Sequence, residues 1–529
     1  MSLRTRTRRE LFGDVGRGMI AAAVGTGLAA DLGFAFAADE PGRLTFGDLE
    51  PLVAFLQETP ADKLLPKVVE KLNAGTDLKT LTAAAALANA RAFGGEDYVG
   101  FHTLMALAPA YNMAREEADP ARRALPVLKV LHRNSTRLQE VGGPKAEVLK
   151  PVKPGTLAAG RPAGEQLREV ARKGDMAAAE ATFAAICKDA KPRDMLDALL
   201  YEVDDATEVH RVVLVSRAYD LVNFVGADRA HTLLRQSVHY CVKQEQNAGQ
   251  VKYNQPVREL LPKLLDQHKL VGSKPGTRPA DDAWVAKFCD SVFAATADQG
   301  AGLVAEALAD GIEPEAIGQA LALAANQLLL RDPGRPKQWS GPNKPPGSGH
   351  GDSVGVHCSD TIHAWRNLAR AGDRRTQVTS LLLAGYQVAR DRVQYRQPDV
   401  AGDMLKWEAY PTAAARDAAK GVAADSLMKE LDAAIRARDQ ARAAAVAARI
   451  GAEQSDRAKD VFALLRGFAV ADDGALHAEK YYATASDEFA AARPAFQWRQ
   501  LVALARVSAS AFGYPAPGHD EACKLLKKA

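Results

Sequence analysis

The stretch Asp97-Tyr98-Val99-Gly100-Phe101-His102 decides the fold, because its pattern returns three more times along the chain. The shared pattern is an Asp, four residues and then a His that follows an apolar residue. The further copies run from Asp205 to His210, from Asp352 to His357 and from Asp472 to His477. Internal repetition of this kind is the signature of a repeat architecture. We therefore expect four copies of one structural unit.

Each copy is predicted to belong to a group of about four helices. In the first three copies a matched helical segment begins eight residues after the His, at Ala110, Ala218 and Trp365. A break and a second helix follow, and a helix, a turn and an apolar helix come before. Apolar residues recur with helical spacing, and strict two-residue alternation is not sustained.

These observations predict an all-α fold of helical-hairpin repeats packed as a closed or curved array. The four units are expected at 61–140, 175–245, 292–390 and 425–510. A segment rich in Gly and Pro at 332–355 interrupts the third unit and is interpreted as a loop or lid, since long loops inside compact domains tend to be functional.

Composition restricts the class of protein. The 529 residues are 47% hydrophobic and carry a formal charge of only +3, so the chain can bury a large core and gives no electrostatic reason to bind nucleic acid. The five cysteines are odd in number and scattered. A disulfide framework, a thiolate zinc site and a c-type haem are therefore disfavoured.

Residues 1–37 have the layout of a cleaved export signal, with a basic start, an apolar middle and a small-residue exit at Ala35-Phe36-Ala37. Thr7-Arg8-Arg9-Glu10-Leu11-Phe12 resembles the twin-arginine signal of bacteria. Residues 38–529 are then expected to form a single all-helical domain, exported to the periplasm or beyond the cell by the export machinery. The apolar stretch is too short to span a bilayer, so no stable membrane insertion is expected after cleavage.

The repeated Asp is interpreted as a helix N-cap, which places the His in the second turn of its helix. The returning helices of the first two units carry His132 and His239 at heights that match His102 and His210 on an antiparallel hairpin. Imidazoles at matched height can converge on one ion if the repeats curve around a common centre. The candidate metal ligands are six in number: His102, His132, His210, His239, His357 and His477.

Other interpretations of these histidines stay open. A repeat can retain a His that caps a turn or bonds a backbone carbonyl between helices. Asp360 could share a metal with His357, and His350 could reach the site from the loop. Cys358 is expected to be structural, since it and the adjacent His357 point in different directions on a helix. His363 is expected to be a surface or packing residue.

Two segments resemble the questin-oxidase-like family. Gly100-Phe-His-Thr-Leu-Met105 is similar to that family's His-containing helix start, with Thr103 where the family has Gly. His357-Cys-Ser-Asp-Thr-Ile-His-Ala-Trp-Arg366 is similar to its helix that ends in His-Ala-Leu-Arg. The resemblance implies an all-helical, non-haem iron oxygenase with several His ligands, among them His102, His357 and His363. It also implies a modified lysine in at least one relative, a role assigned to no residue here.

The sequence thus predicts an exported metalloprotein, leaning towards an enzyme. Iron is the expected cofactor, and the expected reaction is oxygenation of a hydrophobic or aromatic small molecule. Two alternatives remain. One is a helical scaffold that binds partners and has structural histidines. The other is a zinc-dependent hydrolase that uses the same residues.

Overall fold

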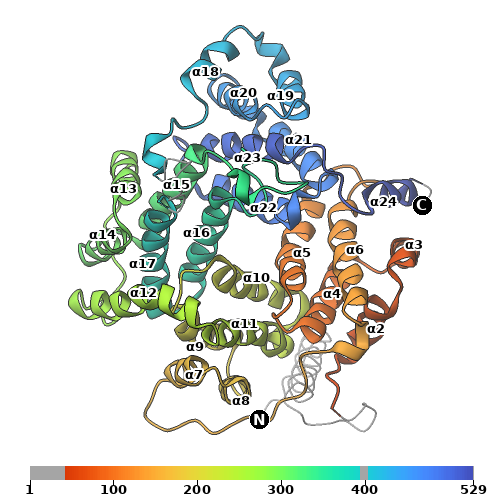
Figure 1. Cartoon of the computed structure of the whole chain (residues 1–529), viewed down its shortest axis with the longest axis vertical. Coiled ribbons are helices and arrows are strands. Elements are labelled where there is room, and N and C mark those ends of the chain that lie inside the picture. Colours follow the sequence, from red (N-terminus) through yellow and green to blue (C-terminus); the bar gives the residue numbers. More distant parts are fainter. Residues whose placement is uncertain (1–41, 394–402, 528–529) are drawn as a thin grey trace, which may run out of the picture.

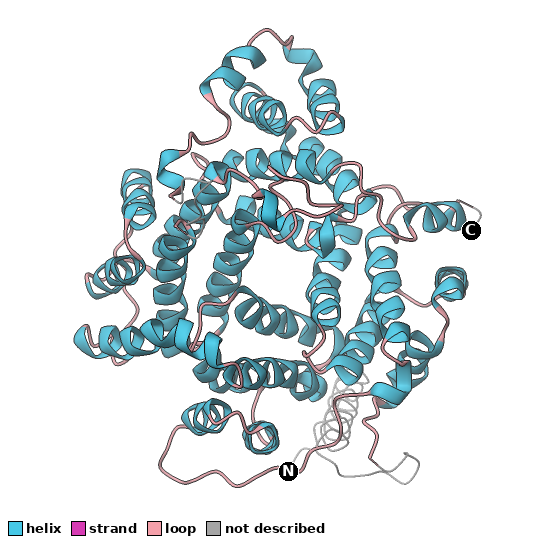
Figure 2. Ribbon diagram, viewed as in Figure 1, coloured by secondary structure: helices cyan, strands magenta, loops and turns pink. Residues whose placement is uncertain are grey.

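The computed structural model describes residues 42–393 and 403–527, and these residues form an all-α protein. The described ranges contain isolated β-bridges and no strand (Figure 2). The predicted export signal at 1–37 lies outside the described residues. The predicted fold class, all-α, is confirmed.

The first three predicted units contain four α-helices each, and the fourth contains five. The first holds α3 (Ala61–Asn73), α4 (Leu78–Phe93), α5 (Tyr98–Glu116) and α6 (Leu125–Glu140). The second holds α8 (Met176–Cys187), α9 (Pro192–Val203), α10 (Val209–Val225) and α11 (Ala230–Glu245). The third holds α14 (Ala297–Ala309), α15 (Pro314–Arg331), α16 (Val354–Ala371) and α17 (Arg374–Asp391). The fourth holds α19 (Leu427–Arg436), α20 (Gln440–Glu453), α21 (Ala458–Ala471), α22 (Ala478–Ala491) and α23 (Trp498–Ala511).

The remaining helices precede, connect or follow these groups. They are α2 (Glu50–Glu58), α7 (Ala163–Arg172), α12 (Ala248–Gln267), α13 (Asp282–Ala294), α18 (Ala413–Ala419) and α24 (His519–Leu526). Short 3₁₀ helices are η1 (Gly47–Leu49), η2 (Gly143–Ala146), η3 (Ala227–Arg229), η4 (Lys337–Trp339), η5 (Met404–Lys406), η6 (Ala424–Ser426), η7 (Ser455–Arg457) and η8 (Gly474–Leu476).

Four helices, one from each unit, form an inner ring. Helix α5 contacts α10 and α22, and α16 contacts the same two helices, so the ring closes (Figure 1). A second layer that includes α6, α11, α17 and α23 lies outside it (Figures 1 and 2). This arrangement is compatible with four repeats packed as a closed array.

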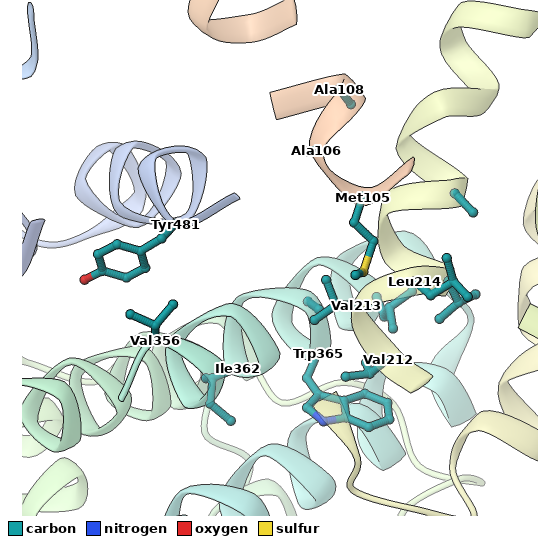
Figure 3. Packing of buried hydrophobic residues seen from close by; sticks show 14 of the residues in the cluster. Met105, Ala106, Ala108, Val212, Val213, Leu214, Val356, Ile362, Trp365 and Tyr481 are labelled. Atoms are coloured by element: carbon teal, nitrogen blue, oxygen red, sulfur yellow. The ribbon is translucent and has the colours of Figure 1, made fainter. Parts of the chain in front are cut away.

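Apolar side chains from the inner helices are buried in the protein core. Met105 of α5, Val213 of α10, Trp365 of α16 and Tyr481 of α22 are each at most 3% exposed and belong to one core cluster (Figure 3). Burial of each large apolar side chain contributes about 1.5–3 kcal/mol to folding. The core therefore holds the four units at fixed positions relative to one another.

The segment that the sequence predicts as a loop or lid connects α15 and α16. It runs from Asp332 to Ser353, slightly shorter than predicted, and contains η4. Asp352 pairs with Arg335 at 2.6 Å and with Lys344 at 2.9 Å, which holds the two arms of the loop together.

No helix in the described part of the chain is long and apolar enough to cross a membrane.

Candidate functional site

Four of the six predicted histidines lie together at the start of the four inner helices. Neighbouring ring centroids are 4.8 Å apart for His102 and His210, 5.6 Å for His210 and His357, 5.1 Å for His357 and His477, and 5.1 Å for His477 and His102. These distances close a ring of four imidazoles, here called the four-histidine centre. It joins residues that are up to 375 positions apart (477 minus 102) in the sequence.

The helix starts that present these side chains differ from the predicted template. Asp97 is the N-cap of α5 and accepts the Gly100 N–H, as expected. Glu208 takes that position in α10, however, and Ser353 takes it in α16. Asp472 ends α21, and His477 is itself the N-cap of α22.

The prediction of a shared Asp cap is therefore correct only for the first unit. The distance from the repeated Asp to the N-cap differs between units: Ser353 directly follows Asp352, two residues separate Asp205 from Glu208, and four separate Asp472 from His477, whose side chain makes no capping hydrogen bond. The histidines consequently range from the N-cap to the second turn, yet all four stay near the same ends of the inner helices.

Hydrogen bonds fix the orientation of two of the rings. His102 Nδ1 lies 2.7 Å from the Tyr98 carbonyl oxygen, which can only accept, so Nδ1 carries the proton. His210 Nδ1 lies 2.6 Å from Glu208 Oε1. The Nε2 atoms of His102 and His210 are both buried without a hydrogen-bond partner. In each of these two rings, Nδ1 is therefore hydrogen-bonded and Nε2 is available to bind a ligand.

The other two rings face each other directly. His357 Nε2 and His477 Nε2 are 3.0 Å apart. Burial, followed by His210 and the cation of Lys480, lowers the pKa of His357 to about 3. Burial and Lys480 likewise lower the pKa of His102 far below its usual value. At neutral pH these two imidazoles are uncharged, which is the form that binds metal ions.

These spacings can be compared with those of imidazoles around one ion. With nitrogens about 2.1 Å from the ion, cis nitrogens lie about 3.0 Å apart in a square arrangement and about 3.4 Å apart in a tetrahedral one. The corresponding ring centroids lie about 4.6 to 5.3 Å apart. The observed ring spacings cover a similar range. In the described part of the chain, however, no group of three or more His, Cys, Asp or Glu side chains already meets the requirements of a metal site.

Glu208 is a central partner of the four-histidine centre that sequence reasoning missed. Its carboxylate accepts hydrogen bonds from His210 Nδ1 at 2.6 Å, from the Tyr240 hydroxyl at 2.8 Å and from the Arg211 N–H at 3.0 Å. Burial favours the neutral acid, but these interactions dominate and hold the pKa of Glu208 at about 2. Glu208 is therefore ionised at neutral pH and locks the proton of His210 on Nδ1 whenever that ring is neutral.

Aromatic rings and a buried amine complete the surroundings. The rings of Tyr98 and Phe101 lie 4.3 Å and 4.9 Å from His102. Lys480, one helical turn after His477, is 3% exposed, and burial lowers its pKa to about 8 in spite of nearby Asp360. The centre is thus bordered by two aromatic rings, and the Lys480 cation is close enough to lower the pKa of both His102 and His357.

His132 and His239 lie outside the four-histidine centre. The His132 ring packs against Gly518 before α24. His239 lies between two carboxylates, with Nδ1 at 2.9 Å from Glu96 and Nε2 at 2.7 Å from Glu180. The height argument located these residues along the hairpin but did not determine which face of α6 and α11 they occupy. Both helices belong to the outer layer, and their histidines meet other partners.

The residues whose roles the sequence left open all have partners within the fold or are buried in it. His350 is not a free loop residue, because its ring lies 2.8 Å from both Ser510 Oγ and the Asn343 carbonyl oxygen. His363 is buried rather than exposed and lies 3.0 Å from Glu488. Asp360 accepts a hydrogen bond from Thr484 at 2.8 Å, and burial raises the pKa of the Cys358 thiol.

Two sequence signals could have pointed to the missed residues. Glu208 is an acidic N-cap candidate two residues before a repeated His, a spacing that allows a carboxylate to reach the ring. Lys480 follows His477 by three residues and so shares its helix face.

Comparison with known proteins identifies no relative, since no family model, curated protein or solved structure matches this chain.

Proposed function

We propose that the four-histidine centre binds one transition-metal ion and that the protein is a metal-dependent oxidoreductase. The observation that carries the proposal is the convergence of four imidazoles from four distant segments, two of them with buried, unpartnered Nε2 atoms. A buried polar atom without a partner costs about 1–3 kcal/mol. Two such atoms in one place destabilise the fold unless a bound ligand supplies the interaction that they lack.

Iron is the proposed ion and O₂ activation the proposed chemistry. Imidazole ligands suit iron, zinc, copper and nickel, and the absence of a cysteine from the centre disfavours a thiolate site. A bound iron ion would supply the redox chemistry, and the substrate would be a hydrophobic or aromatic small molecule. The resemblance of the segments around His102 and His357 to oxygenases with histidine-bound iron supports iron over zinc. Zinc bound to the same residues would instead indicate a hydrolase.

The residues of the chain have distinct roles in this proposal. The Tyr98 carbonyl and the Glu208 carboxylate hold the Nδ1 protons of His102 and His210, so that the Nε2 lone pairs face the centre. Such partners raise the basicity of the ligand and fix its direction. Phe101, which is 5% exposed, shields these rings from water, and Lys480 supplies a buried cation three residues after His477. We further propose that the protein works outside the cytoplasm, because residues 1–37 have the layout of an export signal.

Metal analysis of the purified protein tests the proposal. The protein is prepared without a histidine tag, and its metals are measured by mass spectrometry. The expected result is about one iron per chain, with loss of the metal in the double variant H102A/H210A. The double variant H132A/H239A is the matched control, since it also removes two histidines but leaves the centre intact.

Three outcomes separate the candidate functions. Iron that is lost only in H102A/H210A supports the oxygenase. Zinc lost in the same variant supports the hydrolase and contradicts the iron assignment. No metal in the folded wild-type protein, even after incubation with Fe²⁺ or Zn²⁺, overturns the metal proposal and leaves a helical binding scaffold.

A further inference from the structure

A small cavity lies directly beside the four-histidine centre. His477 and Ala478 form part of its wall, and the rest comes mainly from apolar side chains of α16, α21, α22 and α23, including Val356, Phe468, Leu504 and Ala511. Its free volume of about 30 Å³ is room for about two water-sized molecules. An aromatic substrate would not fit this space without rearrangement.

One polar group in the cavity wall has no partner. Tyr481 lines the cavity, is 2% exposed, and its hydroxyl makes no hydrogen bond within the described structure. His350 and Asp472, which also line the cavity, are engaged in hydrogen bonds. Asp472 accepts the N–H groups of Gly513 and Tyr514 at 2.9 Å and 3.2 Å. A ligand in the cavity would therefore meet mostly apolar walls, and the unpartnered Tyr481 hydroxyl could donate a hydrogen bond to it.

The loop between α15 and α16 closes one side of the cavity through His350 and Gly351. Ser510 fastens this wall, because its Oγ lies 2.8 Å from both the Gly349 N–H and His350 Nδ1. The wall is thus a separate loop segment held by a few hydrogen bonds. Small uncharged molecules can pass such a wall more easily than ions or bulky molecules, because their desolvation cost is low.

We propose that this cavity is a docking site for an uncharged, apolar molecule of the size of O₂, held beside His477. The inference deepens the proposed function and rests on it for the identity of O₂. The cavity supplies the apolar surroundings that such a molecule prefers to water, and the Tyr481 hydroxyl supplies one hydrogen-bond donor. Dry apolar cavities in proteins bind xenon for the same physical reason.

Xenon is the probe for the test. Crystals of the full chain are pressurised with xenon, and the anomalous density in the cavity is compared with that of untreated crystals. We expect one xenon atom within van der Waals distance of Val356 and Leu504. The variant A511L should remove the site by filling the cavity. The control A322L adds the same atoms at a buried alanine of α15, outside this cavity, and should keep the xenon site.

The wild-type measurement decides the inference even if A511L fails to fold. Ordered water in the cavity that xenon does not displace, or xenon bound only elsewhere, overturns the docking site. The xenon experiment requires no metal, so its failure is distinguishable from failure of the metal proposal. Xenon bound in a protein that binds no metal would leave the cavity assignment standing and remove its link to O₂ chemistry.

Discussion

Replacing Glu208 with Gln tests how the four-histidine centre is held in place. The substitution keeps the size of the side chain but removes the charge, and the amide offers one acceptor oxygen where the carboxylate offers two. In the wild-type protein the Glu208 carboxylate accepts hydrogen bonds from His210 Nδ1 at 2.6 Å, from the Tyr240 hydroxyl at 2.8 Å and from the Arg211 N–H at 3.0 Å. The pKa of about 2 means that Glu208 is ionised throughout the neutral range, so the change in charge is complete.

The expected magnitude follows from the hydrogen bond to His210. Loss of a carboxylate that orients a metal-binding His lowers metal affinity about 10- to 100-fold, which is about 1.4–2.7 kcal/mol. The Kd is measured by competition of metal-free protein with a chromophoric chelator, for Fe²⁺ without oxygen and for Zn²⁺. The matched control is E96Q, because Glu96 also contacts a His Nδ1, that of His239, but lies outside the centre.

Comparison of E208Q with E96Q tests whether Glu208 orients His210 for metal binding. The account expects E208Q to bind metal 10- to 100-fold more weakly and E96Q to match the wild-type protein within about twofold. Equal affinity in E208Q and the wild type would refute the role of Glu208. An equal loss in E96Q would instead show that His239 takes part in metal binding, as the sequence alone suggested.

Three further predictions concern stability. The pKa of His239 is raised, because its hydrogen bonds to Glu180 and Glu96 outweigh burial, so its contribution to stability is fully present below about pH 6.5 and is lost as the pH rises through the raised pKa. The free energies of unfolding of the wild type and of H239Q, measured in urea, should therefore approach each other at high pH. A difference that stays constant with pH would contradict this. Tyr481→Phe should stabilise the ligand-free protein by about 1–2 kcal/mol, because it removes a buried, unpartnered hydroxyl, and a destabilised variant would show that the hydroxyl has a partner. Gly300→Ala should destabilise the protein by about 1–3 kcal/mol, because a Cβ would lie 2.6 Å from a backbone carbonyl oxygen of α17. An unchanged free energy of unfolding would show that α14 and α17 can separate at little cost.

The sequence predicted the all-α class and the residues that meet at the centre, because both depend on repetition. A motif that recurs in each unit occupies equivalent places in each unit, and the inner ring brings these places together. His102, His210, His357 and His477 could therefore be selected without knowledge of the packing. Spacing along a helix pair sets height, but tertiary packing decides which helix faces the ring interior. The outer positions of His132 and His239 could not be read from height alone.

Capping was the second limit of sequence reasoning. Asp97 fits the expected N-cap, but the other three repeated Asp residues lie before the N-cap, and Glu208 and Ser353 cap their helices instead. Several residue types cap helices almost equally well, so a repeated spacing does not determine which one is used. The partner of His210 is therefore visible only when the helix start is known.

The central claim is that four imidazoles from four repeats share one ion. The most direct measurement is a crystal structure of the metal-loaded protein with anomalous data collected at the iron and zinc absorption edges. The account predicts one anomalous peak about 2.1 Å from Nε2 of at least three of His102, His210, His357 and His477. A peak elsewhere, or no peak while the four rings keep their positions, would contradict it.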